Sequence, residues 1–159
     1  MGDMLVKLYE LPPLAPKLEP LAKQGIVVRR AIAPERDRVL EWVKDFFSVN
    51  WRSETAVAFA HVPVGCFIAV KDDDVLGFAD YDATLRGFFG PTGVDEKYRG
   101  KGIGTALILA CMHAMRSDGY GYAVIGGAGP TEFYEKTVGA VAIEGSKPGI
   151  YKGAVYKRR

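Results

Sequence analysis

The stretch Val94-Asp-Glu-Lys-Tyr-Arg-Gly-Lys-Gly-Ile-Gly-Thr-Ala-Leu107 decides the fold of this chain. It follows an apolar run, Gly87–Val94, and continues into a segment that is apolar almost all round. Between these lie three glycines and three interleaved cations: Gly100, Gly102, Gly104, Lys97, Arg99 and Lys101. Glycine lets a bound group approach the backbone closely, and the first turn of a helix offers unpaired N–H groups and a positive dipole end. The pattern therefore predicts a strand, a turn and a helix start that bind a phosphate or pyrophosphate.

The composition is that of an ordinary globular domain. The 159 residues suffice for one domain with a sizeable core, and the net charge of +2 is too small to indicate a nucleic-acid binder. No apolar run has membrane length and no signal-peptide pattern is present, so we expect a cytoplasmic protein that does not bind membranes. Cys66 and Cys111 lie in apolar surroundings and are expected to be reduced core thiols, and no metal site is expected.

The first 25 residues differ from the rest of the chain. Four prolines between Pro12 and Pro20 prevent a long helix, although Met4–Tyr9 has the pattern of a short strand. We therefore expect residues 1–25 to be an N-terminal appendage that packs on the domain or on a second subunit. Residues 26–159 are expected to form that domain, with Lys157–Arg159 as a free basic tail.

Hydrophobic periodicity predicts the order of elements in the domain. The expected strands are 26–32, 66–70, 75–81, 86–94, 120–125, 140–144 and 150–156, and the expected helices are 34–48, 104–117 and 130–137. The segment 54–61 could be a further helix or could line a pocket. Gly90-Pro91 interrupts the strand 86–94, because proline cannot donate to a ladder and glycine marks a bulge or close approach. This order predicts an α+β fold, a mixed sheet with helices on both faces.

Two segments carry a resemblance to a known family. Arg99-Gly-Lys-Gly-Ile-Gly104 resembles the acetyl-CoA motif of the GNAT N-acetyltransferases, and Phe133-Tyr-Glu-Lys136 resembles the family's second motif. The order of elements from Ile26 to Tyr156 also looks like that fold. The resemblance implies a mostly antiparallel sheet with a splayed central strand pair, and it implies acetyl-CoA as cosubstrate of a small-molecule type of member.

The resemblance also implies where the cofactor binds. The backbone around the glycine-rich turn would hold the pyrophosphate, and the end of the preceding strand would pair with pantetheine in the gap opposite Val124-Ile125. The implied cofactor-binding residues are Thr92, Gly93, Val94, Arg99, Gly100, Lys101, Gly102, Ile103, Gly104 and Thr105. A backbone N–H near Thr92 would polarise the thioester carbonyl.

The resemblance assigns an acid more clearly than a base. Tyr134 matches the family's usual general acid, and a phenol with a pKa near 10 can protonate a thiolate whose acid has a pKa near 8.5. Some members carry a glutamate base on the strand before the motif, but Phe88 stands there in this chain. The base could be water or one of four side chains near the expected cleft: Asp80, Asp82, Glu54 and His61.

Two functions remain open at the level of the sequence. The first is an N-acetyltransferase that transfers acetyl from acetyl-CoA to the primary amine of a small molecule, by direct attack in a ternary complex. The acidic candidates favour a cationic amine, and a homodimer is a possible assembly. The alternative is a CoA- or acyl-CoA-binding sensor or interaction module without transferase activity, which the missing strand glutamate motivates.

Overall fold

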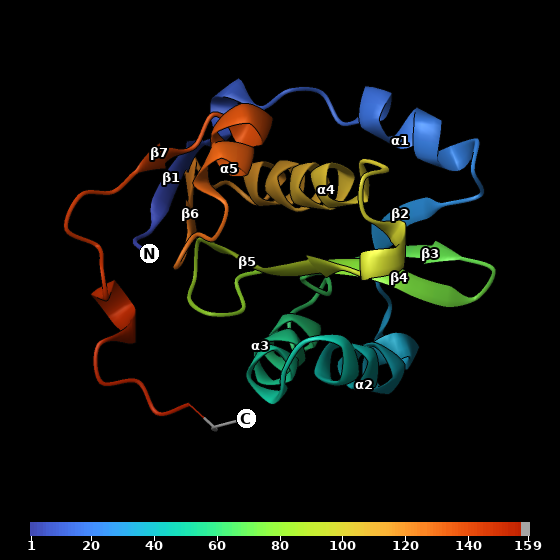
Figure 1. The fold of residues 1–159 in the computed structure, drawn as a ribbon, viewed down its shortest axis with the longest axis horizontal. Coiled ribbons are helices and arrows are strands. Elements are labelled where there is room, and N and C mark those ends of the chain that lie inside the picture. Colours follow the sequence, from blue (N-terminus) through green and yellow to red (C-terminus); the bar gives the residue numbers. More distant parts are fainter. Residues whose placement is uncertain (157–159) are drawn as a thin grey trace.

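The computed structural model describes residues 1–156, so the expected basic tail, residues 157–159, lies outside the described part. A seven-stranded sheet with the order β2-β3-β4-β5-β6-β1-β7 forms its centre (Figure 1). The strands are β1 (Met4–Lys7), β2 (Val27–Arg30), β3 (Cys66–Lys71), β4 (Asp74–Tyr81), β5 (Phe88–Val94), β6 (Tyr122–Ile125) and β7 (Val141–Ala142). The helices are α1 (Ala15–Ala22), α2 (Arg36–Phe46), α3 (Val49–Phe59), α4 (Ile103–Ser117) and α5 (Thr131–Val138). The expected α+β class is confirmed, because β5 and β6 are the one parallel pair among these strands.

Helices cover both faces of the sheet. Helix α4 lies on one face, and α2 and α3 lie on the other (Figure 1). The two faces have separate apolar clusters, one of which contains Leu107 and Ile108 of α4 and the other Val43 of α2. The segment of α4 is apolar almost all round because the helix is enclosed by the sheet and by residues of α1 and α5. Strand β4 lies between both layers and is buried on both faces.

Strands β5 and β6 separate after a short paired stretch. They pair only at Phe88 with Val124 and at Phe89 with Ile125. On its other side, β5 stays paired with β4 as far as Val94, with a register irregularity opposite Gly90-Pro91. The distortion predicted from these two residues is confirmed. Because β6 has separated from β5 beyond Phe89, the backbone groups on that side of β5 face a gap. Alternate residues of a strand direct their N–H and C=O groups to opposite sides.

The N-terminal residues contribute a strand to the sheet. β1 pairs antiparallel with β6 and with β7, so it lies inside the sheet. Its alternate side chains Met4 and Val6, together with Leu8, are fully buried. Residues 1–25, which were expected to be an appendage, therefore supply core side chains and join the terminal strands together.

The expectation for the C-terminal segment was wrong. Residues 150–156 do not form a strand: a 3-10 turn spans Gly149–Tyr151, and no strand follows it in the described chain. β7 pairs with β1 instead, and glycines and a proline after it interrupt extended pairing. The segment leads from β7 to the α3 side of the sheet (Figure 1). The helix considered for 54–61 exists but begins earlier, at Val49, because Ser48 caps it.

Candidate active site

Two pockets meet where β5 and β6 separate. The glycine-turn pocket, of about 500 Å³, is lined by Phe47, Trp51, Thr92, Gly93, Val94, Arg99, Gly100, Gly102, Ile103, Gly104, Thr105, Ile108, Pro130, Phe133 and Tyr134. The aromatic pocket, of about 570 Å³, is lined by Ser48, Asn50, Trp51, Glu54, Thr84, Phe89, Gly90, Pro91, Thr92, Gly126, Gly127, Ala128, Gly129, Pro130, Tyr134, Tyr151 and Tyr156. Four residues line both: Trp51, Thr92, Pro130 and Tyr134. The pockets are therefore two ends of one cleft.

The glycine-turn pocket has an accessible backbone. Gly100 and Gly102 have φ values of +83° and +88°, a conformation that other residues rarely adopt. A Cβ atom at either position would meet nothing within 4 Å, so this backbone faces open space. Gly102 is the N-cap of α4, and its carbonyl oxygen accepts from Ala106 N, so the N–H groups of Ile103, Gly104 and Thr105 have no partner within the helix.

This arrangement fits the pyrophosphate of CoA. Helix N–H groups, a positive dipole end and a glycine backbone converge on one pocket, and Arg99 lies at its exposed rim. Every residue expected from the sequence to hold the cofactor lines this pocket except Lys101, whose Nζ lies 3.4 Å from Gln24 Oε1. The gap beyond Phe89 lies between the two pockets and could admit a thin chain such as pantetheine.

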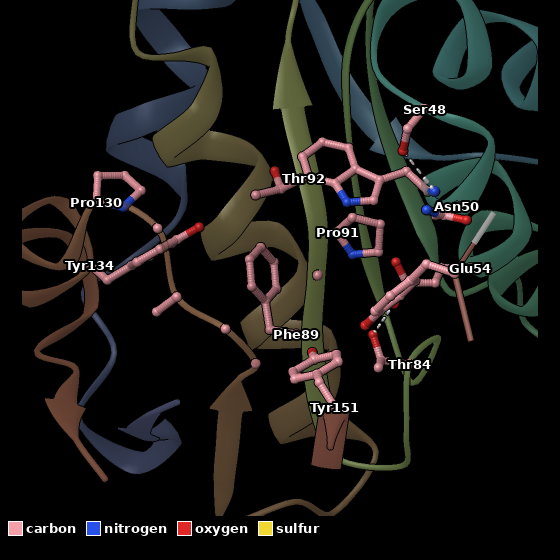
Figure 2. Close-up of a pocket in the computed structure, with 17 residues that line it drawn as sticks. Ser48, Asn50, Glu54, Thr84, Phe89, Pro91, Thr92, Pro130, Tyr134 and Tyr151 are labelled. Carbon is pink, nitrogen blue, oxygen red and sulfur yellow. Dashed lines mark hydrogen bonds between the residues drawn. The ribbon is translucent and has the colours of Figure 1, made fainter. Parts of the chain in front are cut away.

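Tyr134 lies at the junction of the two pockets. It is placed by α5, which begins after Pro130, and only 7% of its surface is exposed. Figure 2 shows its ring pointing from α5 toward Thr92 on β5. Burial raises the pKa of the Tyr134 phenol, so the group keeps its proton at neutral pH and can donate it.

The aromatic pocket contains one carboxylate. Among the described residues that line it, Glu54 is the only charged one. Its Oε1 accepts a hydrogen bond of 2.5 Å from Thr84 Oγ1 (Figure 2). Burial raises the pKa of the Glu54 carboxyl, while the bond from Thr84 opposes that rise. A raised pKa makes this carboxylate a stronger proton acceptor.

Comparison with protein-family models matches residues 36–140 to the acetyltransferase (GNAT) family. The match covers more than half of the chain and includes both motifs. The chain belongs to the GNAT acetyltransferase family. A comparison of this GNAT chain with curated proteins found no match.

Solved structures agree with the GNAT fold. A GCN5-related N-acetyltransferase from Sphaerobacter thermophilus superimposes with a TM-score of 0.68 at 22% identity, covering 89% of this chain and 48% of the other. The GCN5-related glucosamine N-acetyltransferase region of a fungal multi-domain β-N-acetylglucosaminidase gives 0.72 at 15% identity, covering 89% and 19%. A tandem GNAT protein of clavulanic acid biosynthesis gives 0.56 at 16%, covering 89% and 49%. This chain thus spans about half or less of their lengths, and at these identities the likeness concerns the fold.

The aspartates expected as possible bases of this GNAT chain lie outside both pockets. Asp80 is fully buried on β4, where its Oδ2 accepts from Thr55 Oγ1 at 2.6 Å. Asp82 has left the strand at a φ of +53°, and its carboxylate accepts bonds from Gly87 N and Tyr120 Oη. Asp82 therefore stabilises a turn and does not face the cleft from the strand.

Of the other base candidates, Glu54 lines the cleft and His61 does not. His61 is exposed, and its Nε2 lies 2.8 Å from the carbonyl oxygen of Asp82. Sequence reasoning missed Tyr151 and Tyr156 as wall residues of the aromatic pocket. Their segment read as a strand, and only the glycines and proline around them pointed to an irregular path.

Residues 1–156, the described part of the chain, contain neither a metal-binding cluster nor a membrane-spanning helix. In that part of the chain no group of three or more His, Cys, Asp or Glu side chains could hold a metal ion. No helix there is long and apolar enough to cross a membrane.

Proposed function

We propose that this GNAT chain is an N-acetyltransferase that transfers acetyl from acetyl-CoA to the primary amine of a small molecule. The observation that carries the proposal is the position of Tyr134, which lines both the glycine-turn pocket and the aromatic pocket. Acetyl-CoA would occupy the first pocket and the amine the second, so that both reactants meet beside Tyr134 and Thr92. Holding two reactants in one cleft replaces a collision by a positioned attack.

In this scheme the residues of the first pocket bind and orient. Backbone N–H groups from Gly100 to Thr105 hold the pyrophosphate, and Lys97, Arg99 and Lys101 add positive charge near the rim. The backbone from Thr92 to Val94 directs the pantetheine chain into the gap beside β5. The bound cosubstrate supplies an activated acetyl thioester.

The residues at the junction move protons. The amine nitrogen attacks the carbonyl carbon, its C–N bond forms, and Glu54 accepts the proton that the nitrogen loses. The C–S bond then breaks, and Tyr134 donates its proton to the departing sulfur. Between these two steps the former carbonyl oxygen carries a negative charge, which a backbone N–H at Thr92 stabilises. Tyr134 regains its proton from solvent.

Calorimetric titration with acetyl-CoA tests the first part of this proposal. We expect saturable binding, and no heat at high micromolar acetyl-CoA would rule the proposal out. Tyr134→Phe should lower kcat by about 10²-fold or more, with little change in the dissociation constant of acetyl-CoA, because it removes an acid and leaves the ring. Tyr122→Phe is the matched control, since Tyr122 is exposed on β6. Equal loss of activity in both variants would contradict the role of Tyr134.

One observation favours a second function, a CoA-binding module without transferase activity. Among the described residues no carboxylate lines the glycine-turn pocket, and Phe88 stands where some members have a glutamate. Thiol release on a broad panel of amines separates the two functions. Tight binding of acetyl-CoA without release of CoA on any amine would support the module.

A further inference from the structure

We propose that the aromatic pocket selects an acceptor with one positive charge and an apolar body, of the arylalkylamine class. Its ammonium group would lie against Glu54, and its body against Tyr151 and Trp51. This inference rests on the proposed function, because it takes the aromatic pocket as the acceptor side of the cleft. The observations that carry it are the charge of the pocket, the state of its polar groups and the nature of its walls.

The charge of the pocket argues for a single cation. Glu54 is the only ionisable carboxylate or cationic side chain among the described residues that line it. No lysine, arginine or histidine is in that lining to pair with a carboxylate, so an amino acid would bury an unpaired anion. A diamine or polyamine would bring two or more ammonium groups to one carboxylate. A monoamine leaves neither charge unmatched.

The polar groups of the pocket argue against a polyol such as an amino sugar. The hydroxyl hydrogens of its two threonines are already donated within the protein: Thr84 Oγ1 donates to Glu54, and Thr92 Oγ1 donates to Phe78 O. The backbone N–H groups of Gly127 and Ala128 are likewise bound to Asp3 Oδ1 and Gly2 O. Each sugar hydroxyl that enters without a partner would cost free energy.

The walls of the pocket suit a flat apolar group and a nearby cation. Trp51, Phe89, Tyr134, Tyr151 and Tyr156 present five aromatic rings to it. Burial, with Glu54 nearby, raises the pKa of Tyr151 to about 12 and also raises that of Tyr156. Both phenols therefore remain neutral at physiological pH. Neutral rings attract a cation through their faces and an arene through stacking.

Gly126 gives a selective way to disturb this wall. A Cβ atom on Gly126 would lie 2.4 Å from Tyr151 Oη and 3.0 Å from the ring of Phe88. The hydroxyl is the far end of a flexible side chain, so Gly126→Ala would push Tyr151 out of place at small cost to the fold. Figure 2 shows Tyr151 beside Phe89.

A ligand that cannot be acetylated tests the acceptor class without chemistry. Calorimetry with trimethyl(2-phenylethyl)ammonium should give saturable binding, and Glu54→Gln should raise its dissociation constant by about 5- to 30-fold, because a desolvated cation loses its counter-charge. Glu41→Gln, an exposed change on α2, is the matched control and should leave the constant unchanged. No binding to the unaltered protein, or equal effects of the two changes, would overturn the inference.

A second pair of variants tests the aromatic wall. Tyr151→Ala and Gly126→Ala should each raise the dissociation constant of the same cation by about 3- to 10-fold, since both remove the ring from its position. Tyr9→Ala is the control, because Tyr9 is an exposed tyrosine outside both pockets. Thermal unfolding midpoints check that each variant is folded. Folded variants that bind the cation like the unaltered protein would contradict the placement of the ligand.

Turnover separates the acceptor class from the proposed function. With acetyl-CoA we expect kcat/KM for 2-phenylethylamine to exceed that for glucosamine, phenylalanine and 1,4-diaminobutane by at least about tenfold each, since each competitor leaves a charge or hydroxyl unpaired. Preference for glucosamine, together with no binding of the quaternary cation, would overturn the acceptor class and leave the transferase intact. Binding of the cation without acetylation of any amine would support the acceptor class and contradict the transferase function.

Discussion

At Asp80 the fold buries a carboxyl group completely. Thr55 Oγ1 donates to one oxygen, but Oδ1 has no partner in the described part of the chain. Burial raises the pKa of Asp80 to about 7 and outweighs the bond from Thr55, which lowers it. Below about pH 7 the neutral acid is therefore the main form of Asp80 in the native state. The bond to Thr55 joins β4 to α3 one residue away from Glu54.

This burial predicts that stability falls as the pH rises. The native pKa of Asp80 lies above its ordinary value of 3.8, so the native state binds more protons than the unfolded state between those values. The free energy of unfolding should drop by about 2–3 kcal/mol between pH 5 and pH 8 from this group alone. Urea unfolding of Asp80→Asn should show a smaller drop. Asp45→Asn, an exposed control on α2, should keep the full drop; equal slopes in all three proteins would disprove this account.

At Glu54 the raised pKa predicts a feature of the pH–rate profile. A carboxylate that accepts the amine proton must be ionised, so kcat/KM should decline as the pH falls through its pKa, which lies above 4.5. Glu54→Gln should lower kcat/KM by about 10²-fold and remove this acid limb. Initial rates between pH 5 and pH 9 provide the measurement. Glu41→Gln, the exposed control on α2, should keep the acid limb, and an acid limb that persists in Glu54→Gln as well would exclude Glu54 as the base.

Among the elements, α3 carries one wall of the aromatic pocket. Both Trp51 and Glu54 project from its first turns, and Ser48 fixes where the helix begins by accepting a bond from Trp51 N at 3.1 Å. Ser48→Ala should lower the free energy of unfolding by about 1 kcal/mol, because a helix N–H loses its cap, while Ser48→Asp should restore it. Ser53→Ala on the exposed face of the same helix is the control. Chemical unfolding of the three variants measures the difference, and a loss as large at Ser53 would refute the cap.

How well the elements could be predicted depended on whether local sequence determined them. The α4 segment and the break at Gly90-Pro91 were predicted correctly, because apolar periodicity and the lack of a proline N–H act within a few residues. The place of β1 between β6 and β7 could not be predicted, since its pairing joins residues more than a hundred positions apart. For the same reason, helical spacing alone could not place Tyr134 beside the glycine-rich turn. Only the family resemblance predicted that the two lie together.

At the scale of the whole molecule, β1 holds the end of the sheet together. Met4 pairs with Ile125 of β6 and with Ala142 of β7, and its side chain is 1% exposed. Met4→Ala should lower the free energy of unfolding by about 2–5 kcal/mol, because it leaves a cavity in the core. Tyr9→Ala, an exposed change in the same segment, should cost much less. Thermal and urea unfolding compare the two, and similar costs would show that β1 is peripheral.

The walls of the aromatic pocket come from two parts of the chain: the region that matches the family model, and the C-terminal segment beyond it. Tyr151 and Tyr156 lie outside residues 36–140, the part that matches the family model, whereas Tyr134 and the glycine-rich turn lie inside it. Tyr156 is more than half exposed, so little of the core depends on it. Under the proposed function, a library randomised at these two positions would alter which acceptors bind while leaving the glycine-turn pocket unchanged, which makes the C-terminal segment the natural place to change acceptor preference.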